Sequence, residues 1–142
     1  MSTAITKTEY EVLAEFRYSL SLFLHISKNA AEEEGVTPQQ HQALLAIMGF
    51  PGREKITIGE LAERLQIRHH SAVGLVNRLE SENLIIRSPA LNDRRKVLIS
   101  LTEHSLSILE TLSITHREAL LQLAPKLCLL LERITKLAVG EN

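Results

Sequence analysis

The fold is decided by the segment Ile58–Leu101, which reads IGELAERLQIRHHSAVGLVNRLESENLIIRSPALNDRRKVLISL. Thr57, immediately before it, and Glu60 have the spacing of a capping box, in which each side chain accepts a hydrogen bond from an otherwise unpaired backbone N–H. We therefore expect a helix to start at Gly59. The residues that give this helix one apolar side are Leu61, Ala62 and Leu65.

A second helix is expected close behind the first. Gln66–His69 reads as a turn, and the pattern predicts a helix over residues 69–82, so that the two helices form a helix-turn-helix. One side of the second helix is apolar and the opposite side is polar. The apolar side comprises Ala72, Leu75, Val76 and Leu79, and the polar side comprises His70, Gly74, Asn77 and Ser81, flanked by Ser71 and Arg78. Asn83 stands where a helix commonly ends on a left-handed residue.

Two strands and a basic turn follow the second helix. Leu84–Arg87 and Lys96–Leu101 are rich in Ile, Val and Leu, and residues 88–95 between them carry two arginines. This pattern predicts a β-hairpin with a long basic tip. Residues 56–58 could add a short third strand beside the hairpin.

Five motifs in this part of the chain resemble one protein family. They are Ile58-Gly59-Glu60-Leu61-Ala62, Val76-Asn77-Arg78-Leu79-Glu80, Asn83-Leu84-Ile85, Asp93-Arg94-Arg95 and Val97-Leu98-Ile99-Ser100-Leu101-Thr102. Together they resemble the MarR (multiple antibiotic resistance regulator) transcription factors. The resemblance implies a mainly α fold with a small β-hairpin wing (α+β), a winged helix-turn-helix with N- and C-terminal dimerisation helices. It also implies a homodimeric repressor that binds a pseudo-palindromic operator in double-stranded DNA and is relieved by a small molecule.

The composition indicates one soluble domain with enough mass to bury a core. The apolar run near the C-terminus, Leu127–Leu131, has five residues, far fewer than a membrane span requires. The first residues lack a basic start followed by an apolar core, so no secretory signal is expected. The single cysteine, Cys128, excludes an intramolecular disulfide and is compatible with the cytoplasm, where we expect the protein to act without a cofactor.

Positive charge is concentrated in the helix-turn-helix and the hairpin. Residues 1–52 carry three Lys/Arg and six Asp/Glu, for a net charge of −3, and residues 102–142 carry four and five, for −1. Residues 53–101 carry nine and six, for +3, in a chain whose total is −1. A phosphate-binding surface requires such a concentration, although this excess is modest.

Amphipathic helices are expected on both sides of the central segment. Residues 8–33 carry apolar side chains at helical spacing. Thr37, Pro38 and Gln40 are typical of the start of a second helix, which should run to about Met48.

The region after the hairpin is again periodic. Thr102–Leu123 has helical spacing, and Pro125 could kink this helix or start another. We expect a new helix over Lys126–Val139. Its apolar stripe comprises Leu127, Leu130, Leu131, Ile134, Leu137 and Ala138.

Two interpretations of this stripe remain open. It could pack only on the first helix of its own chain, or the first and last helices could interdigitate with those of a second copy, as the resemblance implies. We expect the second arrangement within a single domain of residues 1–142. Residues 1–36 and 102–142 would be dimerisation helices, and residues 53–101 the winged DNA-binding module.

The resemblance assigns the polar side of the second helix and the hairpin tip to DNA. The candidate DNA-binding residues are Arg68, His69, His70, Ser71, Gly74, Asn77, Arg78, Asp93, Arg94, Arg95 and Lys96. We expect His70 and Asn77 to face base edges in the major groove, whereas arginines hold phosphates. Gly74 would leave room for close approach to DNA, or else serve close packing. The alternative for the helix is a merely solvated face.

The hairpin tip could be only a soluble turn, but three cations are more than a turn needs. In the family, an Asp-x-Arg at this place braces the wing and puts an arginine into the minor groove. Asp93 and Arg95 fall on those positions. Arginine suits the negative potential of a narrow groove.

Other side chains suggest regulatory sites. Zinc-sensing relatives exist, but the six histidines show no i, i+4 pair with a third ligand nearby, so no metal is expected. Cys128 could sense oxidants, but its place in an apolar stripe favours a buried structural thiol. Family members often hold a small anionic or aromatic ligand between the first helices and the winged module. Arg17 and His41 are candidates by location only, the alternatives being a surface ion pair and a helix-start histidine.

Other classes of function are less compatible with the sequence. No Ser/Cys-His-Asp set, phosphate loop or paired buried carboxylates can be assembled, so we expect no enzyme. A winged helix that serves only as a protein-interaction module, or a metal-responsive member of the family, is the alternative. A purely protein-binding wing would have little use for Arg94, Arg95 and Lys96.

Overall fold

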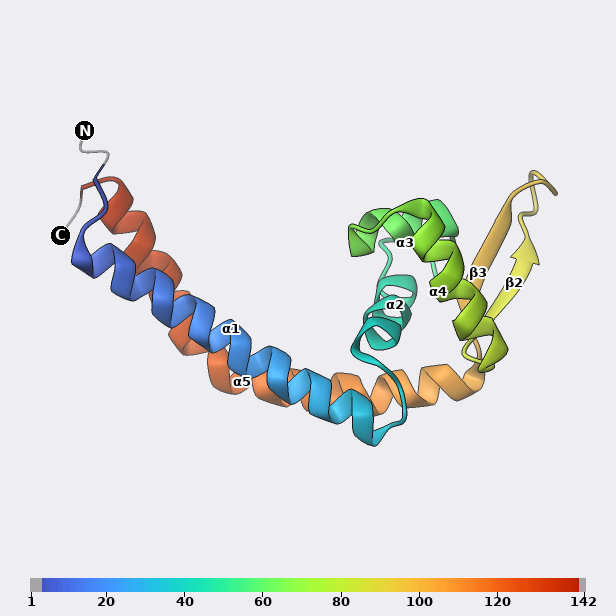
Figure 1. The fold of residues 1–142 in the computed structure, drawn as a ribbon, viewed down its shortest axis with the longest axis horizontal. Coiled ribbons are helices and arrows are strands. Elements are labelled where there is room, and N and C mark those ends of the chain that lie inside the picture. The colour runs from blue at the N-terminus through green and yellow to red at the C-terminus, as the bar shows by residue number, and fades with distance from the viewer. Residues whose placement is uncertain (1–3, 141–142) are drawn as a thin grey trace. The chain divides into compact units, whose positions relative to one another are not determined.

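The computed structural model describes residues 4–140 (Figure 1). The chain divides into two compact units. One, which we call the winged unit, is Ala31–Ser113. The other, the helical unit, combines the residues up to Ala30 with those from Ile114 onward.

The winged unit has helices and a small antiparallel sheet, as predicted. Its elements are α2 (Pro38–Met48), β1 (Ile56–Thr57), α3 (Ile58–Leu65), α4 (His69–Ser81), β2 (Ile85–Pro89), β3 (Val97–Leu101) and the first part of α5 (Glu103–Ala138). The strand order is β1-β3-β2, and Ile99 of β3 pairs with Ile56 of β1 and with Arg87 of β2. The predicted fold class, hairpin and third strand are therefore confirmed.

The core of the winged unit combines one side of each of its helices with the sheet. Its largest fully buried side chains include Leu44, Ile47, Ile56, Leu61, Leu75, Val76, Leu79 and Ile99. Burying each of these side chains contributes roughly 1.5–3 kcal/mol. The whole predicted apolar side of α4 is buried. This packing fixes the rotation of α4, so that its polar side faces outward.

The local signals at helix ends are confirmed. Thr57 Oγ1 accepts a hydrogen bond from Glu60 N at 3.1 Å, and Glu60 Oε1 accepts one from Thr57 N at 3.0 Å. With this capping box, α3 begins at Ile58, one residue earlier than predicted. Asn83 has a φ of +59° and Gln66 one of +54°, the left-handed conformation that commonly ends helices.

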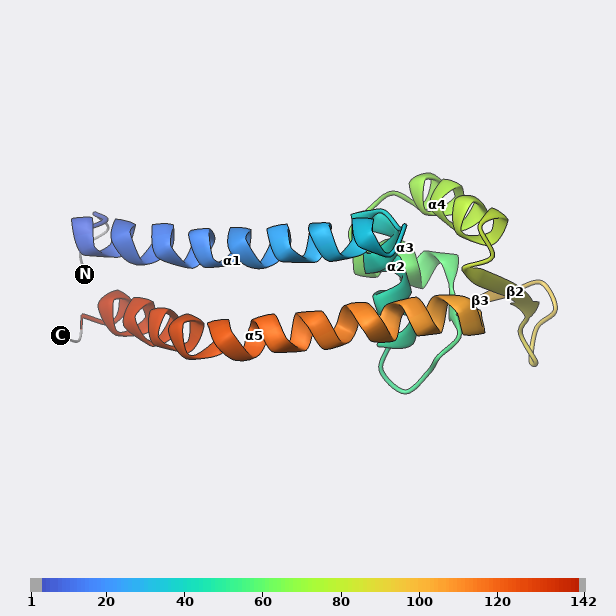
Figure 2. The same cartoon turned by 90° about the horizontal axis from the view of Figure 1, so that it is seen from below.

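The helical unit contains α1 (Lys7–Glu33) as far as Ala30 and the C-terminal part of α5. The two helices lie side by side and antiparallel (Figure 1, Figure 2). Val12 and Leu130 are buried, and Lys126 Nζ lies 2.9 Å from Glu15 Oε2. Across residues 4–140, no helix is long and apolar enough to cross a membrane.

The prediction that a new helix begins after Pro125 is wrong, because this residue lies inside the continuous helix α5. An interior proline removes a backbone hydrogen bond and costs about 3 kcal/mol. Packing favours continuity nevertheless. Partly or fully buried leucine and isoleucine side chains occur at helical spacing on both sides of the proline, at Leu123, Leu127, Leu130, Ile134 and Leu137. A break would take part of this stripe out of register with α1.

The prediction that Cys128 is a buried thiol is also wrong, since its side chain is exposed. The apolar residues near it occupy more than one side of α5. Leu130 is buried, with 6% of its surface exposed, whereas Leu131 is 51% exposed. Cys128 lies on the outward side, which the sequence alone does not distinguish from the inward one.

Candidate nucleic-acid interface

The outward side of α4 is polar from its first residue. Arg68 is the N-cap residue, and its side chain makes no capping hydrogen bond. His69, His70 and Ser71 follow in the first turn, and all three are exposed. The structure therefore brings the predicted residues of the helix start together on one open surface.

Packing among residues 4–140 does not require a glycine at position 74. A Cβ atom built at this position would meet no nearer neighbour than Arg78 Nη1, at 3.7 Å, which is an ordinary contact. Glycine in a helix interior costs about 1 kcal/mol relative to alanine. The close-packing explanation for Gly74 therefore has no support within the winged unit, and α4 presents no side chain at this position of its surface.

Asn77 lies on the same side, and its amide is already engaged. Arg87 Nη2 donates a hydrogen bond to Asn77 Oδ1, while Arg87 Nε donates to Glu80 Oε1 at 3.2 Å. Arg87 belongs to β2 and was not among the predicted site residues. The signal that could have found it is its position in a strand that starts directly after the bend at Asn83, where every second side chain faces back toward α4.

The tip of the hairpin is braced by Asp93. Its Oδ1 accepts a hydrogen bond from Arg95 N at 3.0 Å and lies 3.5 Å from Arg95 Nε. Its backbone oxygen accepts a further bond from Lys96 N at 3.0 Å. The Arg95 side chain remains 94% exposed, and Arg94 and Lys96 are exposed as well. The structure thus brings the four predicted residues of the tip together, and all three of its cations are exposed.

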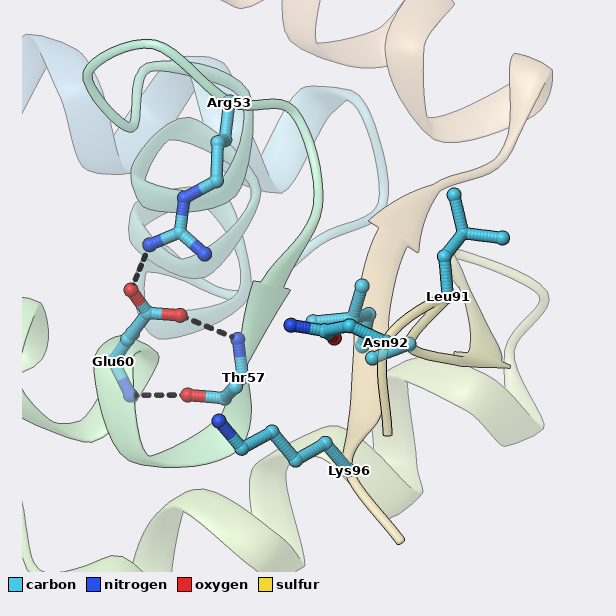
Figure 3. A pocket seen from close by; sticks show the side chains of 8 residues that line it. Arg53, Thr57, Glu60, Leu91, Asn92 and Lys96 are labelled. Carbon is cyan, nitrogen blue, oxygen red and sulfur yellow. Dashed lines mark hydrogen bonds and ion pairs between the residues drawn. The ribbon is translucent and has the colours of Figure 1, made fainter. Parts of the chain in front are cut away.

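A surface pocket of about 630 Å³ lies where the hairpin approaches the start of α3 (Figure 3). Its lining comprises Arg53, Thr57, Glu60, Ala90, Leu91, Asn92, Lys96 and Leu98. Arg53 forms an ion pair with Glu60, and the guanidinium groups of Arg53 and Arg64 lie 4.8 and 4.9 Å from the ring centre of Phe50. Sequence reasoning missed these two arginines because their partner, Phe50, is in an irregular loop.

The contacts of Glu60 with Thr57 and Arg53 also shift the pKa of its carboxyl group. Burial alone raises its pKa, but the hydrogen bond from the Thr57 backbone and the ion pair with Arg53 lower it, so that the pKa lies below its ordinary value of 4.5. Glu60 is therefore ionised at neutral pH, and it neutralises Arg53 at the start of α3.

The cations of the winged unit fall into two groups. Arg53, Arg87 and Arg95 form ion pairs with Glu60, Glu80 and Asp93, respectively. Within residues 4–140, no ion pair occurs at Lys55, Arg64, Arg68, Arg78, Arg94 or Lys96. This second group supplies charges that can bind an external anion without first breaking an ion pair.

The candidate ligand-binding residues lie in different units. Arg17 is exposed on α1 in the helical unit, and His41 is buried in α2 of the winged unit, with 4% of its surface exposed. A ligand role for either residue stays a prediction. In the described part of the chain, no three His, Cys, Asp or Glu side chains gather in a way that could hold a metal ion.

Similar proteins share both the sequence pattern and the fold. A model of the MarR family matches residues 34–96. The HTH-type transcriptional repressor MdtR of Bacillus subtilis is 30% identical over 101 residues, which cover 68% of this chain and 63% of MdtR. The chain thus spans less than two thirds of the length of this curated relative.

Solved structures match nearly the whole chain. AbsC, a MarR family transcriptional regulator from Streptomyces coelicolor, has a TM-score of 0.72 and 20% identity, with 99% of this chain and 100% of AbsC covered. A MepR mutant from S. aureus, bound to an oligodeoxyribonucleotide, has a TM-score of 0.64 and 21% identity, with 96% and 99% covered. These structures share the winged fold, and MdtR and the family model share its sequence pattern: the chain belongs to the MarR family.

Proposed function

We propose that the protein is a sequence-specific DNA-binding transcriptional regulator that acts as a homodimer. The observation that carries this proposal is the polar outward side of α4, which lies in the same unit as a hairpin tip with three exposed cations. MdtR is a transcriptional repressor, and the MepR mutant is bound to an oligodeoxyribonucleotide. Both relatives support DNA as the partner, and neither is an enzyme by name.

In this proposal α4 enters the major groove and the hairpin tip lies along the backbone or in the minor groove. The second helix of a helix-turn-helix presents its outer side to base edges. Arg68, Arg78, Arg94 and Lys96 form no ion pair in the described chain, so they can approach phosphates at little cost. Phosphate contacts set the register, and contacts to base edges set the sequence preference.

The homodimer is supported by apolar surface on the helical unit. Leu130 packs inward, but Leu24, Leu121 and Leu131 are 57%, 69% and 51% exposed. Packing within one chain therefore leaves many large apolar side chains in water, and such patches mark interaction sites. A second copy would cover them, and two winged modules would then read the two half-sites of a pseudo-palindrome.

We further propose that the regulator is a repressor and that a small anionic or aromatic molecule relieves it. The name of MdtR supports repression. Arg17, which is exposed on α1, is proposed as a contact for an anion, and His41, which is buried in α2, is proposed separately as a ligand contact within the winged unit. The test is a ligand screen by thermal shift: a ligand should raise the melting temperature of the wild type and release its DNA. It should do neither for the variant, Arg17→Ala or His41→Ala, that lacks its contact residue.

The central experiment is selection of genomic duplex fragments by the full chain. We expect retained fragments to share a pseudo-palindrome with half-sites about one helical turn apart. The logarithm of affinity should fall steeply with the logarithm of salt concentration, because Lys and Arg contacts displace condensed counterions. A flat dependence, or no retained duplex, would instead favour a winged helix that binds only proteins.

A further inference from the structure

The strand β2 carries a residue that controls how α4 presents one of its polar side chains. Arg87 donates to Asn77 Oδ1 through Nη2 and to Glu80 Oε1 through Nε, at 3.2 Å. Asn77 and Glu80 lie one turn apart on α4, so that a single guanidinium spans both. The Arg87 side chain is 30% exposed, and Glu80 is 47% exposed. The cluster is therefore at the surface, at the edge of the outward side of α4.

The chemistry of the pair determines the orientation of the amide. A guanidinium has five N–H donors and no acceptor, so the amide atom that faces it must be the oxygen. The Nδ2 group of Asn77 then points away from Arg87. Glu80 accepts a second hydrogen bond from the same guanidinium. Arg87 is therefore held in place and does not follow a rotation of the Asn77 amide.

We propose that Arg87 is a positioning residue that makes Asn77 a hydrogen bond donor toward the major groove. A free asparagine can turn its oxygen or its nitrogen toward a base edge, whereas a restrained one offers Nδ2 first. Such a donor matches the acceptors of the major-groove edges, which are N7 and O6 of guanine, N7 of adenine and O4 of thymine. The amino group of cytosine, itself a donor, is disfavoured.

The proposal rests on the function proposed above and adds a specificity-determining residue to it. The ion pair also means that Arg87 carries little uncompensated charge. We therefore expect Arg87 to alter which sequences are preferred, rather than to act as a further phosphate contact. A role confined to holding α4 against β2 would change stability and leave the preference unchanged.

Four variants separate these roles. Asn77→Ala removes the amide, and Arg87→Ala leaves the Asn77 amide free to rotate. Asn77→Asp is the most specific test, because its carboxylate can pair with Arg87 but has no hydrogen bond donor for a base edge. Gln39→Ala is the control: Gln39 is exposed on α2 of the same unit and belongs to neither the polar side of α4 nor the hairpin tip.

The experiment is selection from randomised duplexes with the full chain, followed by affinities for the selected site and for its single base-pair substitutions. Affinity ratios are used because Asn77→Asp adds a negative charge that weakens all DNA binding. We expect Asn77→Ala to lose about 5- to 150-fold discrimination at one base pair of each half-site. Arg87→Ala and Asn77→Asp should lose it at the same base pair, and Gln39→Ala should retain it.

Thermal unfolding supplies the structural readout. Asn77→Asp should melt no lower than the wild type, because its pair with Arg87 gains charge. The double variant Asn77→Ala with Arg87→Ala should lose no more discrimination than Asn77→Ala alone, as coupled residues are non-additive.

The inference is overturned if Arg87→Ala or Asn77→Asp keeps full discrimination at that base pair, or if Asn77→Ala changes no position. If Arg87→Ala does not fold, Asn77→Asp decides alone. A wild-type protein that selects no duplex overturns the proposed function. A wild type that selects a site, with variants that select the same one, overturns only the role of Arg87.

Discussion

Replacing Gly74 by alanine should make the protein more stable and a weaker DNA binder. The added Cβ would have Arg78 Nη1 as its nearest neighbour, at 3.7 Å, so no steric cost opposes the helix propensity of alanine. That propensity is worth about 1 kcal/mol, which corresponds to a rise of roughly 4 °C in melting temperature. On DNA, the methyl group would occupy space at a close contact, and overpacking of about 1–3 kcal/mol corresponds to a loss of about 5- to 150-fold in affinity.

The assay pairs thermal unfolding with equilibrium binding to the selected duplex at fixed salt. Gly59→Ala is a matched control, because Gly59 is also helical and its added Cβ would lie an ordinary 3.8 Å from Thr57 Oγ1. It lies outside the predicted DNA-binding residues. A Gly74→Ala protein that is more stable and binds as tightly as the wild type would refute close approach of this helix side to DNA. A Gly74→Ala protein that is less stable than the wild type would show that packing within the protein requires glycine at this position.

Three further outcomes are expected. The pKa of Glu60 is lower in the folded state than its ordinary value of 4.5, so the ion pair and the helix cap that Glu60 forms stabilise the fold above pH 4.5. This stabilisation is lost as the pH falls below that value. Glu60→Gln should therefore flatten the acid limb of melting temperature against pH between 6 and 3. Arg94→Ala and Arg95→Ala should each weaken binding to all DNA sequences and lower the slope of log affinity against log salt concentration by about one. Fluorescence titration at several salt concentrations measures this slope. Unchanged slopes would show that the wing does not contact the DNA backbone. Leu121→Asp with Leu131→Asp should yield a monomer in light scattering, because both side chains are exposed in one chain, and a persistent dimer would locate the interface elsewhere.

The winged unit could be predicted because its signals are local. The Thr57–Glu60 capping box and the left-handed Asn83 each need only a few residues, and the apolar spacing of α4 fixes which side is buried. The polar side of α4 follows directly from that spacing. These are interactions that one segment satisfies by itself.

The features that sequence reasoning missed depend on partners far along the chain. Whether Pro125 ends a helix depends on packing against α1, which outweighs the local cost. Cys128 lies in an apolar region of α5, and packing against α1 determines which side of this region faces inward. Arg87 contacts Asn77 only because β2 folds back beside α4, and Arg53 finds Phe50 and Glu60 from an irregular loop. Spacing along one element does not contain this information.

The proline within α5 also has a consequence for dynamics. Because Pro125 has no N–H, the carbonyl oxygen of Leu121 lacks its usual helical donor, and both residues lie on the exposed side. Water can bind that oxygen, so the helix should open there more readily than elsewhere. In native-state hydrogen exchange, amides near this turn should lose protection before those of the turns around Val12 and Leu130, which makes α5 two neighbouring exchange units within a single continuous helix.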